Sequence, residues 1–250
     1  MGRTSNRSVE RAFALVDELA ENGGGRVSEL AERVDMPVST AHDHLQTLVE
    51  TGYVRMEDKE YQTTTRFLEV GHRQRHRLEV FKAVRDELET VAEETGEHAT
   101  LFVEEADQAV ILAVQEGSDA VNLFAYPGAR MPLHAVAPGK AMLASMPTDR
   151  VEEIIDRHGL VELTSRTITN PDVLFDQLEE IRGQGYAVDE GERIAGMVCI
   201  AAPIFDKNDR VRGAICVCGP QSRIDETRRD EIADVVQRAA NVTQVNLDYV

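Results

Sequence analysis

Three cysteines carry the most reactive side chains of this sequence, and two of them lie close together. Cys216 and Cys218 are separated by one residue in "GAICVCGP", and Cys199 lies upstream in "GMVCIAAPIFD". Residues two apart on a strand face the same side, so the thiols of Cys216 and Cys218 are expected to point the same way. Three roles stay open for them: lining a ligand pocket, filling a core, or sensing a metal or the redox state.

A zinc site needs a fourth ligand beside the three thiols, and Asp189 or His134 would supply it. Cys-x-Cys on a strand is an unusual start for such a site, so no metal ligands are assigned. An odd number of cysteines does not make a disulfide framework. Sensing of a metal or of the redox state through Cys199, Cys216 and Cys218 therefore remains the alternative to a ligand pocket.

Motifs for catalysis are incomplete. The stretch "HAVAPGKA" resembles a phosphate-binding loop, but a Walker A motif requires glycine where His134 stands and serine or threonine where Ala141 stands. No Gly-x-Ser-x-Gly elbow marks a nucleophile. We therefore expect no enzyme, no catalytic residues and no cofactor.

Charge is the strongest signal in the composition. The 250 residues include 45 acidic and 27 basic side chains, for a net charge of −18, and only four of the basic residues are lysines. An acidic, lysine-poor chain is typical of proteins from salt-loving organisms, in which carboxylates keep the surface hydrated. The sequence thus predicts a halophilic source, with an ordinary acidic protein as the alternative.

The charge is unevenly distributed along the chain. Residues 1–77 carry 11 basic and 13 acidic groups, a net charge of −2, whereas residues 78–250 carry 16 and 32, a net charge of −16. The first part is therefore the better partner for a polyanion. No apolar run approaches the roughly 20 residues that span a bilayer, and no signal peptide is evident. We expect a soluble cytoplasmic protein that does not bind a membrane.

The first third of the chain predicts a winged helix-turn-helix. Apolar residues recur at helical spacing over 8–21, a second helix is expected from Ser28 as its N-cap, and a third runs from Val38 to Gly52. The stretch "YVRMEDKEYQTTT" then places a charged turn between two short apolar segments, which indicates a two-stranded wing. The alternative is a three-helix bundle that binds protein.

The rest of the chain predicts an α+β architecture. Residues 67–95 follow the pattern of one charged helix interrupted only by Gly71. Strands are expected at 99–105, 109–116, 120–126, 186–191, 196–206 and 210–219, and helices at 138–146, 148–158, 172–184 and from 225 onward. This order favours a mostly antiparallel sheet with helices packed on it.

Several stretches together resemble the IclR family of transcription regulators. They are "STAHDHLQTLVETGYV" in the winged helix, "LHAVAPGKAMLA", "RGQGYAVDEGE" and "GMVCIAAPIFD", and "GAICVCGP" takes the place of a strand that contains serine in that family. The resemblance covers nearly the whole chain. It implies a winged helix-turn-helix DNA-binding domain over 1–66, a linker helix over 67–96 and a GAF-like α/β effector-binding domain over 97–250.

The same resemblance implies partners. We expect double-stranded operator DNA, a small-molecule effector, and a homodimer that in some members pairs into a dimer of dimers. The expected effector is a small organic acid or sugar acid, because a helix beginning at Ala137-Pro138-Gly139 offers free backbone N–H groups that attract anions. Lys140, which follows, is expected to pair with a carboxylate instead.

Contacts with DNA are expected from the start of the third helix and from flanking cations. The third helix contains no Arg or Lys, but Asp43 lies between His42 and His44 and can accept from a cytosine amino group. Arginines from Arg3 to Arg77 form the expected basic rim that holds phosphates. The predicted DNA-binding residues are Arg7, Arg26, Ser39, Thr40, His42, Asp43, His44, Arg55 and Lys59.

Contacts with the effector follow from the resemblance. Asp189 and Cys199 match an aspartate and a cysteine that bind effector in some family members, and Cys216 and Cys218 match serine positions. Cysteine in place of serine keeps the size of the side chain but weakens its hydrogen bonds. The predicted effector-binding residues are Ala137, Pro138, Gly139, Asp189, Cys199, Cys216 and Cys218.

Overall fold

The computed structural model describes residues 6–122 and 125–249. Capping residues set both ends of its first helix. The Asn6 side chain accepts a hydrogen bond from the Ser8 N–H at 3.1 Å, and Gly23 ends the helix in a left-handed conformation. The chain divides by its contacts into Met1–Gln74 and Arg75–Val250. The first unit contains α1 (Arg7–Asn22), α2 (Val27–Arg33), α3 (Val38–Glu50), β1 (Val54–Glu57), β2 (Glu60–Thr63) and most of α4 (Arg66–Arg75).

The second helix begins one residue before Ser28, which was expected to be its N-cap. Arg26 occupies the N-cap position of α2, and the Glu29 side chain accepts a hydrogen bond from the Arg26 N–H at 3.1 Å. The Glu29 carboxylate in the first turn thus satisfies the backbone N–H of the N-cap residue, and Ser28 lies within that turn.

The wing is present. Strands β1 and β2 pair antiparallel, and Asp58 and Lys59 form the two-residue turn between them with φ values of 50° and 68°. Positive φ at both turn residues matches the right-handed twist of a hairpin. Tyr61 of β2 is buried and bridges to Gly25, which ties the hairpin to the helices. The winged helix-turn-helix prediction is confirmed.

Three helices replace the single helix expected over 67–95. Helix α4 is followed by α5 (Glu79–Ala83) and α6 (Arg85–Thr95). The break lies near Arg75, whose guanidinium stacks over the Phe81 ring at 4.7 Å and donates to the Leu112 carbonyl at 3.3 Å. Helices α5 and α6 belong to the second unit, and α6 buries Leu88 and Val91 in its core.

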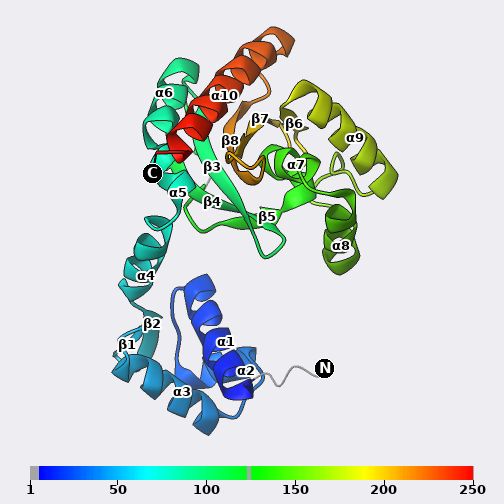
Figure 1. The fold of residues 1–250 in the computed structure, drawn as a ribbon. Coiled ribbons are helices and arrows are strands. Elements are labelled where there is room, and N and C mark those ends of the chain that lie inside the picture. The colour runs from blue at the N-terminus through cyan, green and yellow to red at the C-terminus, as the bar shows by residue number, and fades with distance from the viewer. Residues whose placement is uncertain (1–5, 123–124, 250) are drawn as a thin grey trace. The chain divides into compact units, whose positions relative to one another are not determined.

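A six-stranded antiparallel sheet organises the second unit (Figure 1). Its strand order is β5-β4-β3-β8-β7-β6. The strands are β3 (His98–Glu105), β4 (Gln108–Gln115), β5 (Arg130–Pro132), β6 (Ala187–Glu190), β7 (Met197–Phe205) and β8 (Val211–Pro220). The helices are α7 (Ala137–Ala144), which follows a 3-10 turn at Leu133–Ala135, then α8 (Thr148–His158), α9 (Pro171–Gln184) and α10 (Glu226–Leu247).

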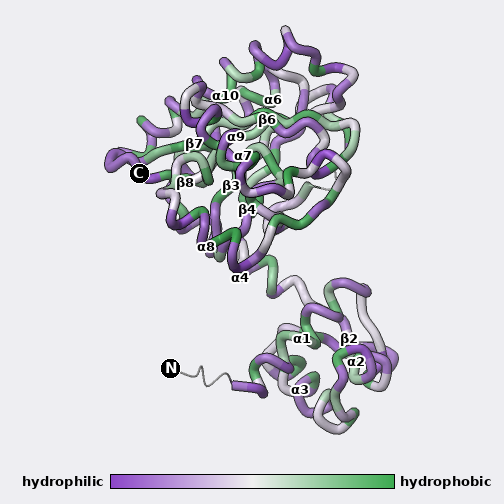
Figure 2. The backbone as a smooth tube through the Cα atoms, turned by 90° about the vertical axis from the view of Figure 1, so that its right-hand side faces the viewer, coloured by the Kyte–Doolittle hydropathy of each residue, from purple (hydrophilic) through white to green (hydrophobic). Residues whose placement is uncertain are grey.

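Helices cover both faces of this sheet and create two separate cores. Helices α5, α6 and α10 pack on one face, around Ile215 and Val217 of β8. Helices α7, α8 and α9 pack on the other, around Phe102 and Cys216. In Figure 2 the hydrophobic segments lie mainly in the strands between these layers. Alternate residues of each strand therefore belong to different cores.

The strand expected over 120–126 is not a strand in its described part, and residues 123–124 lie outside the described residues. Backbone carbonyls in this segment and just before it bind side chains instead of a neighbouring strand. The Asp119 carbonyl accepts from Arg223 at 2.7 Å, and the Val121 carbonyl binds His98 Nε2. These contacts tie the start of the segment to β3 and to the turn after β8 without a ladder. None of the described helices is long and apolar enough to cross a membrane.

Candidate functional site

The exposed start of α3 is the surface that can read DNA. Ser39, His42 and Asp43 are exposed, and Thr40 and His44 are half-buried. The Asp43 carboxylate lies 3.8 Å from His42 Nδ1, so these two polar groups face solvent as a pair. Their contact with bases stays a prediction.

The flanking cations differ in their exposure and in their contacts with other side chains. Arg7 and Lys59 are exposed, at the start of α1 and at the tip of the wing. Arg26 lies 4.0 Å from Glu60, and Arg55 donates to the Gln62 side chain at 2.7 Å. Arg75 is held by contacts inside the second unit, and Arg3 lies outside the described residues. Fewer cations are therefore available for the basic rim than the sequence predicts.

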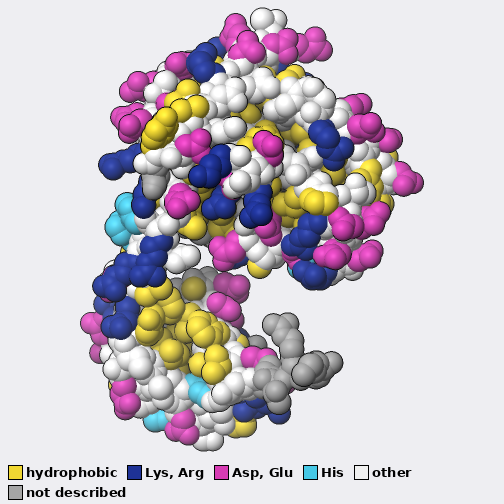
Figure 3. Space-filling model, in the orientation of Figure 1, with side chains coloured by type: hydrophobic (Ala, Val, Ile, Leu, Met, Phe, Trp, Pro, Cys, Tyr) yellow, Lys and Arg dark blue, Asp and Glu magenta, His cyan; other side chains and the backbone are white. Residues whose placement is uncertain are grey.

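An apolar patch covers part of the first unit, as Figure 3 shows by its cluster of hydrophobic side chains. On α1, Val9 and Phe13 are 51% and 59% exposed, and on α4, Leu68 and Val70 are 72% and 49% exposed. Phe13 and Leu68 line one open groove of about 1000 Å³. Apolar surface of this kind on a soluble domain marks an interaction site.

A cavity lies between the sheet of the second unit and α7. It encloses about 520 Å³ of space, including its open mouth. Strand residues form its floor and the loop after β6 forms one wall. The lining residues are His98, Thr100, Phe102, Ile111, Ala125, Met131, Val136, Pro138, Asp189, Arg193, Ile194, Met197, Cys199, Cys216 and Cys218.

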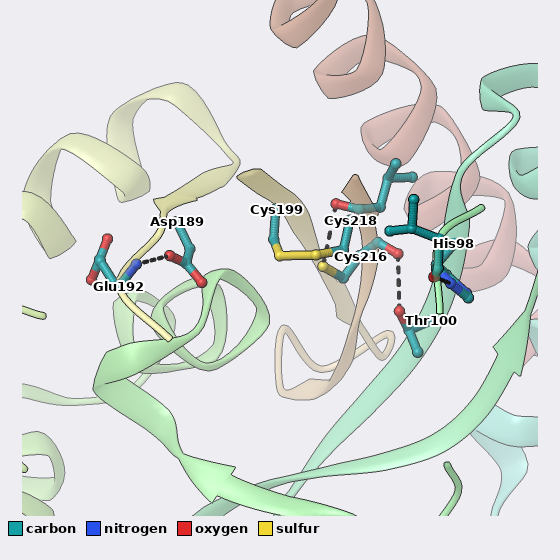
Figure 4. Close-up of a disulfide and its surroundings, with 9 residues drawn as sticks. His98, Thr100, Asp189, Glu192, Cys199, Cys216 and Cys218 are labelled. Atoms are coloured by element: carbon teal, nitrogen blue, oxygen red, sulfur yellow. Dashed lines mark hydrogen bonds between the residues drawn. A yellow bond between two sulfur atoms is a disulfide. The ribbon is translucent and has the colours of Figure 1, made fainter. Parts of the chain in front are cut away.

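The strand register brings four polar residues into one row on the cavity floor. His98 of β3 lies opposite Cys218 of β8, which lies opposite Cys199 of β7, which lies opposite Asp189 of β6. Directly opposite residues of antiparallel strands share a face. All four residues line the cavity, and Figure 4 shows the two sulfurs lying between Asp189 and His98.

Cys199 and Cys218 are joined by a disulfide, which the sequence analysis did not expect. Their Cα atoms are 4.1 Å apart, the short separation of a pair of opposite residues that share no backbone hydrogen bonds. Cys216 remains a free, buried thiol. Only the strand register, which cysteine spacing does not reveal, brings Cys199 and Cys218 together.

The predicted effector-binding residues lie in different places. Pro138, Asp189, Cys199, Cys216 and Cys218 line the cavity, whereas Ala137 and Gly139 are buried beside it without lining it. Pro138 has no N–H, so the first turn of α7 offers the cavity fewer donors than expected. A Cβ at Gly139 would lie 2.1 Å from the Leu133 carbonyl oxygen, so Gly139 allows close packing of α7 on the preceding turn.

A buried ion pair anchors the loop that forms the cavity wall. Lys140 of α7 is fully buried, pairs with Glu192, and donates to the Val188 carbonyl at 2.8 Å. Thr167 Oγ1 adds a hydrogen bond to the Glu192 carbonyl at 2.6 Å. Lys140 pairs with a carboxylate as expected, so its charge holds the loop rather than a ligand.

Burial also shifts the pKa values of two side chains on the cavity floor, Asp189 and Cys216. Asp189 is 3% exposed, and burial raises its pKa to about 6, although its carboxylate accepts the Glu192 N–H at 2.6 Å. Burial likewise raises the pKa of the Cys216 thiol, and the nearby Asp189 charge adds to the effect. Near neutral pH the floor thus holds one partly protonated carboxyl and one neutral thiol.

His98 and Arg193 are cavity residues that the sequence analysis missed. His98 Nε2 binds the Val121 carbonyl and must donate, so in the neutral ring Nδ1 is an acceptor. That Nδ1 is buried without a hydrogen-bond partner among the described residues. Arg193 is half-buried, and within the described part of the chain its guanidinium forms no hydrogen bond or ion pair. Alternation with Thr100 and Phe102 on one strand face was the available signal for His98.

The described residues contain no group of three or more His, Cys, Asp or Glu side chains placed to hold a metal ion. Two of the three thiols proposed for a zinc shell form the disulfide. The zinc alternative therefore loses its ligands, whereas a partly apolar cavity lined by Arg193 suits a small organic anion.

Comparison with protein families matches both units. The model described as "Bacterial transcriptional regulator IclR C-terminal" matches residues 72–244, and that described as "IclR helix-turn-helix domain" matches residues 8–58. The HTH-type transcriptional regulator BhcR of Paracoccus denitrificans is 35% identical over 94% of this chain and 85% of its own length. A regulator from Halobacterium salinarum is 30% identical over 96% of this chain and 94% of its own length.

Solved structures share the fold. The IclR structure from Thermotoga maritima aligns with a TM-score of 0.80 and 31% identity over 97% of this chain and 99% of that one. An IclR homologue from Microbacterium hydrocarbonoxydans, complexed with 4-hydroxybenzoate, aligns with a TM-score of 0.84 and 22% identity over 97% and 100%. The predicted fold class is confirmed.

Replacing Asp189 by asparagine should flatten the pH dependence of stability. A folded carboxyl with a pKa of about 6 binds its proton more tightly than an unfolded one with a pKa of about 4. The free energy of unfolding of the wild type should therefore fall as the pH rises through this window, by on the order of 3 kcal/mol relative to Asp189→Asn. Urea unfolding at a series of pH values measures the difference.

The exposed Asp234 of α10 provides the control, because Asp234→Asn should follow the wild-type curve. Parallel curves for wild type and Asp189→Asn would show that burial does not perturb this carboxyl.

Proposed function

The chain belongs to the IclR family of transcription regulators, and from this membership we propose that it binds an operator with its first unit and a small organic acid with its second. The observation that carries the proposal is one chain holding both a winged helix and a cavity lined by Arg193, whose guanidinium forms no hydrogen bond or ion pair in the described part of the chain. Residues 1–66 would then serve as the DNA-binding domain and 97–250 as the effector domain, with 67–96 connecting them. Its relatives in the comparisons are regulators, so we propose no catalytic activity.

The effector we propose carries a carboxylate and a hydroxyl group. Arg193 supplies a cation that forms no hydrogen bond or ion pair with the described residues, although its charge acts on nearby Asp189, and such a cation suits a carboxylate. His98 Nδ1 is an acceptor without a donor among the described residues, and a hydroxyl group supplies one. The 4-hydroxybenzoate held by the Microbacterium protein combines the same two groups and supports this class.

Such an effector regulates only if it binds two arrangements of the protein with different affinity. The operator-bound and operator-free arrangements must then differ at the cavity. Because transcription takes place on chromosomal DNA, we place this regulator in the cytoplasm.

We further propose that the protein acts as a homodimer on a near-palindromic site. The apolar patch of Val9, Phe13, Leu68 and Val70 supports this, since a second copy would bury it. A helix-turn-helix dimer presents two recognition helices to two half-sites.

A halophilic setting is part of the proposal. At molar salt the Debye length falls to about 3 Å, and counterion release contributes little to DNA binding. A recognition helix without Arg or Lys, in a segment (residues 1–77) of net charge −2, is suited to those conditions. The relative from Halobacterium salinarum also supports this setting.

Selection of genomic fragments by the purified protein in near-molar KCl tests DNA binding. We expect a few sharp sites beside a metabolic gene cluster. The double variant Ser39→Ala, His42→Ala should lose about tenfold to a hundredfold in affinity for them, the cost of base contacts. Ser222→Ala, on the exposed surface of the second unit, is the control. No enrichment in either dilute or concentrated KCl, with or without candidate acids, would contradict the proposal.

Replacement of Arg193 by glutamine tests the effector class. Calorimetric titration with a panel of hydroxy acids should find ligands that bind the wild type, and Arg193→Gln should bind them at least tenfold more weakly, because a charged hydrogen bond contributes about 1.5–3 kcal/mol. Arg212→Gln, at an exposed arginine of β8, should bind like the wild type. Equal affinities for wild type and Arg193→Gln would exclude the proposed carboxylate contact.

Charges placed on the apolar patch test the dimer. Phe13→Asp combined with Leu68→Asp should convert the dimer to a monomer in sedimentation experiments, because two carboxylates would be buried at the interface. Val161→Asp is the matched control, since Val161 is 52% exposed in the second unit. A double variant that still sediments as the wild type would place the interface elsewhere.

A further inference from the structure

We propose that Cys199 and Cys218 form a reversible thiol–disulfide exchange site whose reactants are low-molecular-weight thiols and disulfides that enter the cavity. The site changes the hydrogen-bonding groups of the cavity floor, and this regulatory consequence rests on the proposed function. The exchange chemistry itself depends only on the cysteines.

The sheet holds the two sulfurs together in either redox state. Cys199 and Cys218 are directly opposite on β7 and β8, with Cα atoms 4.1 Å apart. The ladder between these strands continues on both sides of the pair, through Val198 with Gly219 and Ile200 with Val217. Reduction therefore leaves two thiols in contact, ready to close again, rather than two separated side chains.

Access distinguishes this pair from the third cysteine. Cys199 and Cys218 are half-buried and line the cavity, so a small molecule in the cavity reaches them. Cys216 is 2% exposed, and burial raises the pKa of its thiol, which keeps it from forming the reactive thiolate. The chain thus contains its own unreactive control.

The oxidising reaction consumes one disulfide, RSSR. The thiolate of one cysteine attacks a sulfur of RSSR, a protein–SR bond forms, and RS⁻ leaves with the electron pair of the broken bond. The thiolate of the second cysteine attacks the protein sulfur of that mixed disulfide, forms the Cys199–Cys218 bond and releases a second RS⁻. Two protons pass from the cysteines to the two RS⁻, so two RSH are produced. Reduction is the same sequence in reverse.

Oxidation alters what the floor offers to a ligand. The reduced row contains two S–H donors between His98 and Asp189, and the oxidised row contains none (Figure 4). A hydroxy acid that accepts from these donors should bind the oxidised cavity about tenfold more weakly, as expected for the loss of about 1.4 kcal/mol of hydrogen bonding.

Labelling of the folded, full-length protein tests the exchange site. After reduction with 2-mercaptoethanol and its removal, N-ethylmaleimide should label two cysteines per chain, mapped to Cys199 and Cys218. After equilibration with bis(2-hydroxyethyl) disulfide the folded protein should take no label and retain no adduct, and renewed reduction should restore both labels. Two labels after oxidation, or labelling of Cys216 as fast as the other two, would overturn the proposal.

Single variants separate the two steps. Cys199→Ser and Cys218→Ser should each retain one mercaptoethanol as a trapped mixed disulfide, whereas Cys216→Ser should behave like the wild type. Phenylarsine oxide gives a second measurement on the unmutated protein, because it bridges two adjacent thiols with loss of one water. One arsenical per reduced chain, and none per oxidised chain, is expected. No arsenical on the reduced chain would show that the thiols do not meet.

These measurements are masses of the protein alone, so they remain decisive if no operator or acid is found. Conversely, operator binding without thiol exchange would retain the proposed function and remove this site.

Discussion

The register between β7 and β8 is the constraint on which the second unit depends. A slip of one residue would turn every side chain of a strand to the other face of the sheet. Cys216 and Cys218 would then enter the core beneath α6 and α10, and Ile215 and Val217 would face the cavity. The cavity, the disulfide and the separation of two apolar cores all follow from one alignment, which the long β7–β8 ladder holds in place.

Helical and strand periodicity predicted the winged helix and most of the sheet, because buried faces impose regular apolar spacing. Periodicity failed where side chains, not the ladder, satisfy the backbone. The stretch after β4 has apolar residues at strand spacing, yet Arg223 and His98 bind its carbonyls. The helix expected over 67–95 breaks near Arg75, where that side chain packs on Phe81. Neither contact leaves a trace in local sequence patterns.

The sequence likewise predicted some residues of the candidate site and not others. Pro138 was predicted to lie on the cavity from the start of its helix, and Asp189 and the cysteines from family resemblance, to which the two-residue spacing of Cys216 and Cys218 adds. The disulfide and the row from His98 to Asp189 could not be predicted, because they depend on which strands are neighbours. Arg193 was missed for another reason: a loop arginine normally faces water, and the contacts that anchor its loop, including the pair of Lys140 with Glu192, are not visible in the sequence.

Helices cover both faces of the sheet, so the cavity lies on one face and the helices that follow the first unit in the chain lie on the other. Helices α5 and α6, through which the chain arrives from the DNA-binding unit, lie on the reverse of the strands that form the cavity floor. In β8, ligand-facing and helix-facing side chains alternate residue by residue. A ligand that shifted β8 would therefore also shift the side chains on which α5 and α6 pack. Helices α5 and α6 thus pack on the face of the sheet opposite the cavity, against strands that also contribute side chains to the cavity floor.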